Sequence, residues 1–213
     1  LGAISPLGNT VAETWEGMIN GKSGAGPITH FDASKFKTHF ACEVKGFDPT
    51  TVIDRKEARK CDRYSLLAIG AAKQAIEDAA FDLEQEDKNR IGVIFAAGIG
   101  GIKTFEDEVM GYEKTKDTVG PKFSPFFIPK MIADIAAGHI SMLYGFRGPN
   151  FATVSACASS TNAIADAFNY IRLGKANVIV TGGAEAAVSP SGVGGFNSMN
   201  ALSTRNDSPE TAS

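Results

Sequence analysis

Residues 90–97 read RIGVIFAA, and this stretch decides the fold. It is a short apolar run with several β-branched residues, which is typical of a strand buried on both faces of a sheet. Residues 178–181 read VIVT and repeat the pattern. Helical patterns lie between the two runs, over residues 129–145 and 157–173. Strands that alternate with helices predict an α/β fold with a largely parallel sheet.

Toward the N-terminus the pattern continues with further helices. Residues 59–80 place apolar side chains along one helical face and predict a long helix. A shorter helix is predicted over residues 10–19, with Gly21 as its stop. Residues 22–58 are rich in Gly, Pro, Thr and Asp, so we expect a mostly irregular segment there.

The composition is that of a globular protein. Hydrophobic residues make up 43% of the chain and charged residues 21%, so a buried core is available. A net charge of −3 and a pI near 5.7 argue against sequence-independent nucleic-acid binding, which needs a basic face. No stretch approaches the ~18 apolar residues of a membrane span. The three cysteines have no metal-ligand or disulfide spacing, and we expect a reduced, cytoplasmic compartment and no metal site.

Both ends of the sequence resemble cuts. The chain begins at Leu1 without a Met, and residues 1–9 resemble the exit of a strand into a Gly/Pro loop. Residues 203–213 form a polar run without a finishing element. We therefore expect a domain truncated at both ends. For this reason the lack of an N-terminal leader is only weak evidence about the compartment.

The segment with the most chemistry is residues 151–162, FATVSACASSTN. A short β-prone run passes through Cys157 directly into a helix, so the thiol is expected at a helix N-terminus. Free backbone N–H groups and the helix dipole favour a thiolate there and could stabilise an oxyanion. The neighbours Ala156, Ala158 and Ser159 are small, so a substrate could approach the sulfur.

A structural role for Cys157 stays open on this evidence, because free cysteines are commonly buried as small hydrophobic residues. Cys42 and Cys61 have no such context and are expected to be structural. A nucleophilic cysteine also needs a base, commonly histidine. The three histidines are better explained otherwise: His30 and His39 lie in the irregular segment, and His139 is expected to be a hydrogen-bonded core residue. Residue chemistry alone therefore gives a thiol nucleophile without a partner.

The motif VSACASS at residues 154–160 resembles the active-site cysteine motif of the β-ketoacyl synthases. Several other segments resemble the same family, in particular its elongating acyl-carrier-protein enzymes of the second type. In chain order they read GIGG (98–101), SPFFIP (124–129), AGH (137–139), GPN (148–150), GGAE (182–185), GVGGF (192–196) and ALSTRN (201–206). The resemblance covers essentially the whole chain, and its ordered set of motifs makes it specific.

This resemblance implies a thiolase-like fold of layered αβαβα architecture, with residues 1–213 as the N-terminal β-ketoacyl synthase domain. It implies that Cys157 accepts an acyl group from acyl carrier protein (ACP) during fatty acid elongation. Decarboxylative condensation with malonyl-ACP then gives β-ketoacyl-ACP and carbon dioxide. A homodimer is implied, without a cofactor of its own, because the substrates ride on the phosphopantetheine arm of the carrier.

The resemblance also assigns binding residues. Ile102 and Phe196 match the lining of the acyl pocket, and Phe127 matches a residue that reaches across the dimer interface into the partner's pocket. The alternative for Ile102 and Phe196 is ordinary core packing. A basic patch for the acidic carrier is implied at three positions, namely Lys56, Arg59 and Lys60. A solvated helix start is the alternative there, although cations near a helix N-terminus are mildly unfavourable.

The family's two catalytic histidines and its supporting lysine would lie downstream of Ser213. We therefore expect the isolated chain to be inactive and to expose a large apolar face. A polyketide ketosynthase is the close alternative, and a non-catalytic chain-length partner the more distant one, although such partners usually lack the cysteine. A thiolase would show a different cysteine motif. Glu185 is expected to fix a loop rather than to act as an acid.

Overall fold

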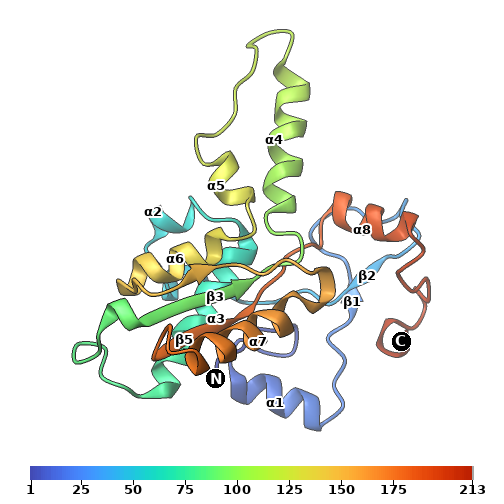
Figure 1. Cartoon of the computed structure of the whole chain (residues 1–213). Coiled ribbons are helices and arrows are strands. Elements are labelled where there is room, and N and C mark those ends of the chain that lie inside the picture. Colours follow the sequence, from blue (N-terminus) through green and yellow to red (C-terminus); the bar gives the residue numbers. More distant parts are fainter. Residues whose placement is uncertain (213) are drawn as a thin grey trace. The chain divides into compact units, whose positions relative to one another are not determined.

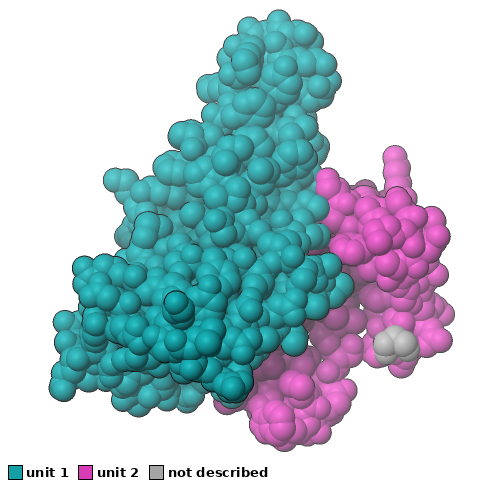
Figure 2. Space-filling view, in the orientation of Figure 1, with its two compact units in different colours: residues 1–2, 49–186 teal, residues 3–48, 187–213 magenta. Residues whose placement is uncertain are grey.

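The computed structural model describes residues 1–212, which form two compact units (Figure 2). Unit 1 contains residues 1–2 and 49–186, and unit 2 contains residues 3–48 and the residues from 187 onward. The strands of unit 1 are β3 (Ile91–Ala96), β4 (Asn150–Phe151) and β5 (Val178–Gly183). Its α-helices are α2 (Arg55–Ala58), α3 (Arg63–Ala79), α4 (Ile102–Thr115), α5 (Phe127–Met131), α6 (Ile135–Tyr144) and α7 (Ser159–Arg172).

The sheet of unit 1 has the strand order β4-β3-β5, and both pairings are parallel. Ile91 lies opposite Val178, and the register continues to Ala96 opposite Gly183. Every residue of β3 is buried, as the apolar run at 90–97 predicts. The predicted α/β fold with a parallel sheet is confirmed.

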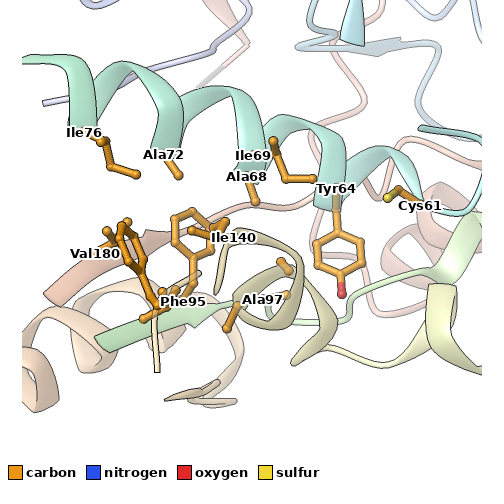
Figure 3. Packing of buried hydrophobic residues seen from close by; sticks show 14 of the residues in the cluster. Cys61, Tyr64, Ala68, Ile69, Ala72, Ile76, Phe95, Ala97, Ile140 and Val180 are labelled. Carbon is orange, nitrogen blue, oxygen red and sulfur yellow. The ribbon is translucent and has the colours of Figure 1, made fainter. Parts of the chain in front are cut away.

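The side chains of β3 alternate between two hydrophobic clusters. Val93 and Phe95 pack with α3 and α6 on one face of the sheet (Figure 3), whereas Ile94 and Ala96 pack with α7 on the other. Figure 1 shows the same layers, with the sheet between these helices. Successive residues of a strand point to opposite sides, so a strand of apolar residues presents an apolar surface to both faces of the sheet.

Two predicted helices differ from the structure. The helix expected over residues 59–80 begins only at Arg63, because the side chain of Asp62 accepts a hydrogen bond from the backbone N–H of Tyr64 and caps it there. The preceding residues form the separate short helix α2. The helix expected from Pro129 is also two helices, α5 and α6, with the chain extended at Ile132 between them.

Helix α4 was missed by the pattern analysis. It is rich in charged residues, and several of its apolar residues, including Phe105 and Met110, are exposed. Helix α4 and the following loop extend away from the sheet, and α5 packs beside the start of α4 (Figure 1). None of the helices in the described part of the chain is long and apolar enough to cross a membrane.

Unit 2 contains α1 (Val11–Ile19), β1 (Gly26–Pro27), β2 (Phe40–Ala41) and α8 (Pro190–Ser198). The strands pair antiparallel. Buried Asn197 of α8 donates to the hydroxyl of Thr38 at 2.9 Å, and that hydroxyl donates to the carbonyl of Ser203 at 2.7 Å. These bonds join the two distant segments that form the unit. The long segment before α3 is mostly irregular, as predicted.

Candidate active site

Cys157 lies in a single 3₁₀ turn, Ala156–Ala158, directly before α7. The turn follows β4, and it lies where β3 and β5 also end. A Cβ added at Gly98, just after β3, would meet the carbonyl oxygen of Ala156 at 3.3 Å. A Cβ added at Gly183, the last residue of β5, would lie 1.9 Å from the hydroxyl of Ser160. The position of Cys157 directly before α7 confirms the predicted placement at a helix N-terminus. The turn also lies at the carboxyl edge of the sheet, where parallel sheets commonly place ligand sites.

Hydroxyl groups fix the turn that carries Cys157. The side chain of Ser159 accepts from the backbone N–H of Ser155 at 2.9 Å and donates to the carbonyl of Ala156 at 2.7 Å. Thr153 donates to the carbonyl of Ser159 at 2.9 Å, and Asn162 donates to the hydroxyl of Ser155 at 2.6 Å. Residues on both sides of Cys157 are therefore held, while the thiol itself is exposed.

The backbone before Cys157 is strained. Ala156 has φ +51°, in the left-handed region that a residue with a Cβ rarely adopts. Such a conformation costs about 1–3 kcal/mol and persists only where surrounding contacts enforce it, often at functional sites. The Ser159 hydroxyl on the Ala156 carbonyl is one such contact. Sequence reasoning missed this feature, since alanine gives no signal for positive φ.

The start of α7 beside Cys157 has no side-chain cap. The capping residue of α7 is Ala158, whose side chain offers no hydrogen bond to the helix start. The backbone N–H of Ser159 donates to the carbonyl of Ala156, so the later N–H groups of the first turn are the candidate donors to a developing oxyanion. A hollow of about 360 Å³ lies beside the segment leading into the turn. Its lining residues are Thr153, Val154, Ser155, Asn162, Ala165 and Asp166.

Glu185 fixes the glycine-rich loop after β3. Its carboxylate accepts from the backbone N–H of Ile99 at 2.7 Å and from that of Gly100 at 3.3 Å. This loop passes close to the Cys157 turn and leads into α4. The expected loop-fixing role of Glu185 is confirmed.

The rings of the three histidines contact residues other than Cys157. His139 on α6 contacts the thiol of buried Cys61 at 3.5 Å, and burial lowers the pKa of the imidazole. Burial also raises the pKa of Cys61 to about 11, so this thiol stays protonated at neutral pH. His30 contacts the carbonyl of Val188, and His39 that of Phe36. Within the part of the chain that the structure describes, no histidine contacts Cys157.

The predicted acyl-pocket residues lie on different elements. Ile102 is the first residue of α4 and is half-buried. Phe127 begins α5 and stacks on Phe123 at 5.4 Å, with Phe105 of α4 at 6.2 Å on a tilted ring. Phe196 is a half-buried residue of α8 in unit 2. Membership of one pocket, and the reach of Phe127 into a second subunit, stay predictions.

The predicted carrier-binding residues cluster in and after α2. Lys56 and Arg59 are exposed, and among residues 1–212 neither side chain forms an ion pair. Lys60 is half-buried: its ammonium pairs with Glu57 at 2.6 Å and lies 5.7 Å from the ring centre of Phe126. Two of the three cations are therefore free to meet an anionic partner, whereas Lys60 already has local partners.

Within the residues that the structure describes, helix α7 has one exposed apolar face. Ala163 and Ala167 are buried against the sheet, whereas Ile164, Phe168 and Ile171 are 55%, 61% and 44% exposed. An exposed apolar face of this kind agrees with the apolar face expected for the isolated chain.

Comparison with known proteins identifies the family. Residues 1–213 match the family described as β-ketoacyl synthase, N-terminal domain. The chain belongs to the β-ketoacyl synthase family. It is 46% identical over its whole length to 3-oxoacyl-[acyl-carrier-protein] synthase 2 of Synechocystis, of which it covers 50%.

Solved β-ketoacyl synthases share the fold. The chain is similar to a β-ketoacyl synthase from Burkholderia phymatum, with 27% identity and a TM-score of 0.84 over 98% of this chain and 51% of that one. It is also similar to a structure of a type II polyketide acyl carrier protein in complex with its ketosynthase bound to the hexaketide. That match has 25% identity and a TM-score of 0.79, over 93% of this chain and 52% of that one. The chain thus spans about half the length of these synthases, and its fold is thiolase-like.

Proposed function

We propose that this chain supplies the nucleophile of a 3-oxoacyl-ACP synthase, an acyltransferase that elongates fatty acids. The observation that carries the proposal is the exposed thiol of Cys157 in a fixed turn at the start of α7. The 46% identity to a 3-oxoacyl-[acyl-carrier-protein] synthase 2 over the whole chain supports the same activity.

In the first half-reaction the Cys157 thiolate attacks the carbonyl carbon of an acyl thioester. The new sulfur–carbon bond forms as the bond to the phosphopantetheine sulfur breaks, and the carrier leaves as its thiolate. One thioester replaces another, so the exchange is nearly isoenergetic. Backbone N–H groups at the start of α7 stabilise the oxyanion of the tetrahedral intermediate.

In the second half-reaction malonyl-ACP loses carbon dioxide, and the resulting carbanion attacks the acyl group on Cys157. A carbon–carbon bond forms, the Cys157 thiolate leaves, and β-ketoacyl-ACP is released. We assign the decarboxylation step to the histidine pair that the family resemblance places outside residues 1–213. We propose that no cofactor beyond the carrier's own arm takes part.

Acyl carrier protein is the proposed partner, and the exposed cations Lys56 and Arg59 are its proposed contact. A basic cluster on a chain of net charge −3 would steer an acidic partner to one place. The similarity to a ketosynthase solved with its carrier protein supports this partner. We also propose a cytoplasmic homodimer, in which Phe127 reaches the pocket of the second subunit.

The activity is tested by condensation of acyl-ACP with malonyl-ACP, using the complete protein in which this chain occurs. The wild type should form β-ketoacyl-ACP, and Cys157→Ala should lose the activity by at least about 10²-fold, since the covalent route is removed. Cys42→Ala should retain it. A folded Cys157→Ala variant with full activity would exclude the proposal. A wild type that accepts only polyketide intermediates would favour the polyketide ketosynthase, whose solved relatives are less similar at 25% identity.

A further inference from the structure

Asp62 joins the first turns of two helices. It is 4% exposed, and one carboxylate oxygen accepts from the backbone N–H of Tyr64 in α3 at 3.1 Å. The other oxygen accepts from the backbone N–H of Thr104 in α4 at 3.2 Å and from its hydroxyl at 2.6 Å. One buried carboxylate thus caps both α3 and α4.

Helix α4 depends on this cap from outside. Its own capping residue is Gly101, which has no side chain to offer, and its first turn contains no acidic residue. The N-terminal N–H groups of a helix need acceptors and carry positive partial charge. Asp62 supplies both the acceptor and the negative charge, and it supplies them from a neighbouring helix.

The start of α4 is also held on its other side. The backbone N–H of Gly101 donates to the carbonyl of Met131, the last residue of α5, at 3.0 Å. Tyr64, two residues after Asp62, donates its hydroxyl to the carbonyl of the next residue, Ile132, at 2.5 Å. The N-terminus of α3 therefore sets the positions of α4 and α5 together.

The two capped helix starts adjoin residues with proposed roles. The proposed carrier-binding segment, which contains Lys56, Arg59 and Lys60, lies just before Asp62, and Ile102, which is predicted to line the acyl pocket, lies two residues before Thr104. We propose that Asp62, acting through Thr104, is a positioning residue that holds Ile102 in place relative to the carrier-binding segment and so sets the acyl-chain preference of Cys157 acylation. This inference rests on the proposed function.

The test uses Thr104→Val in the complete protein, because valine keeps the shape and the backbone N–H but lacks the hydroxyl donor. The rate of Cys157 acylation is measured with butyryl-ACP and with palmitoyl-ACP. We expect the ratio of the two rates to change by about tenfold, since small misplacements near a reacting group have effects of this size or larger. Thr104→Ser keeps the hydroxyl and should stay within about twofold of the wild-type ratio.

Two further variants separate positioning from stability. Asp62→Asn keeps an oxygen to cap α3 but has one acceptor oxygen fewer for Thr104, so it should shift the ratio in the same direction as Thr104→Val. Ile76→Val removes a methyl group from the buried face of α3, far along the helix from Asp62, and should leave the ratio unchanged.

An unchanged ratio in Thr104→Val and in Asp62→Asn, beside an acylated wild type, would overturn the inference and leave Asp62 as a structural cap. A ratio that shifts equally in Ile76→Val would overturn it too, since lost stability would then explain the effect. Absence of any acylation of the wild type would remove the proposed function itself, and the inference with it.

Discussion

The hydroxyl of Ser159 donates a hydrogen bond to the carbonyl oxygen of Ala156 at 2.7 Å, across the residue that carries the thiol. The same hydroxyl accepts from Ser155, so one side chain closes the turn on both sides of Cys157. Ser159 is 3% exposed and Ala156 has φ +51°. A buried serine thus holds the strained backbone that presents the proposed nucleophile.

Ser159→Ala should destabilise the protein by about 1 kcal/mol, because the backbone N–H of Ser155 and the carbonyl of Ala156 each lose a part-buried hydrogen bond to this hydroxyl. Cys157 acylation should also slow, since the turn is free to relax. Ser198→Ala is the matched control: its exposed hydroxyl donates to the carbonyl of Gly194, and its loss should stay within about 0.5 kcal/mol. Urea denaturation and acylation rates check both variants. Equal effects from the two substitutions would contradict this role for Ser159.

Two glycines around α4 should respond in opposite ways to alanine. A Cβ at Gly101 would lie 2.3 Å from the carbonyl oxygen of Lys130, so Gly101→Ala should cost about 3 kcal/mol through overpacking. A Cβ at Gly111 meets nothing within 4 Å, and its position inside α4 favours alanine. Gly111→Ala should therefore stabilise the protein by up to about 1 kcal/mol.

Thermal or chemical denaturation of the two glycine variants distinguishes these effects. A Gly101→Ala variant as stable as the wild type would show that the start of α4 and the end of α5 are not in close contact.

Charge reversal in the basic segment should weaken carrier binding. Arg59→Glu should raise the KM for acyl-ACP by about tenfold with little change in kcat, and its effect should shrink at high salt, where charges are screened. Lys175→Glu makes the same change of charge at another exposed position and is the control. Similar KM values for the two variants would argue against the segment as the carrier contact.

The buried thiol of Cys61 should make stability fall at alkaline pH. Burial raises the pKa of Cys61 from 9.0 to about 11, so between these values the thiol ionises in the unfolded chain but not in the folded one. The stabilisation is fully present below pH 9 and is lost as the pH rises toward about 11. The loss amounts to about 1.4 kcal/mol per pH unit within this window.

Cys61→Ala should show a correspondingly shallower decline of unfolding free energy with pH than the wild type. Tyr64, whose pKa burial raises to about 12, contributes equally to both proteins. Denaturant titrations from pH 8 upward give the two slopes, and parallel curves would show that Cys61 does not stay protonated in the folded state.

The parts of the fold that sequence predicts are those set by local pattern. The run from Ile91 to Ala96 gives β3 because buried parallel strands are apolar on both faces. The stop of α7 is marked by Gly174 with φ +68°. The same reasoning fails where a distant residue decides. The break between α5 and α6 depends on Tyr64, whose hydroxyl binds the carbonyl of Ile132.

The candidate site divides in the same way. The position of Cys157 before a helix follows from residues 151–162, and the family motif adds its role. The positive φ of Ala156 has no sequence signal, because alanine rarely adopts it. The double cap by Asp62 arises from a tertiary contact between segments far apart in the chain. Aspartate directly before a helix is a common capping residue, so the cap on α3 could have been predicted from Asp62 in the sequence.

The most direct measurement is peptide mapping after the complete protein has been incubated with acyl-ACP in the absence of malonyl-ACP. We expect the peptide containing Cys157 to gain the mass of the acyl group, the peptides with Cys42 and Cys61 to stay unchanged, and Cys157→Ala to gain nothing. A folded wild-type protein that carries no acyl group, or carries it on another residue, would contradict the central claim that Cys157 is the acyl acceptor.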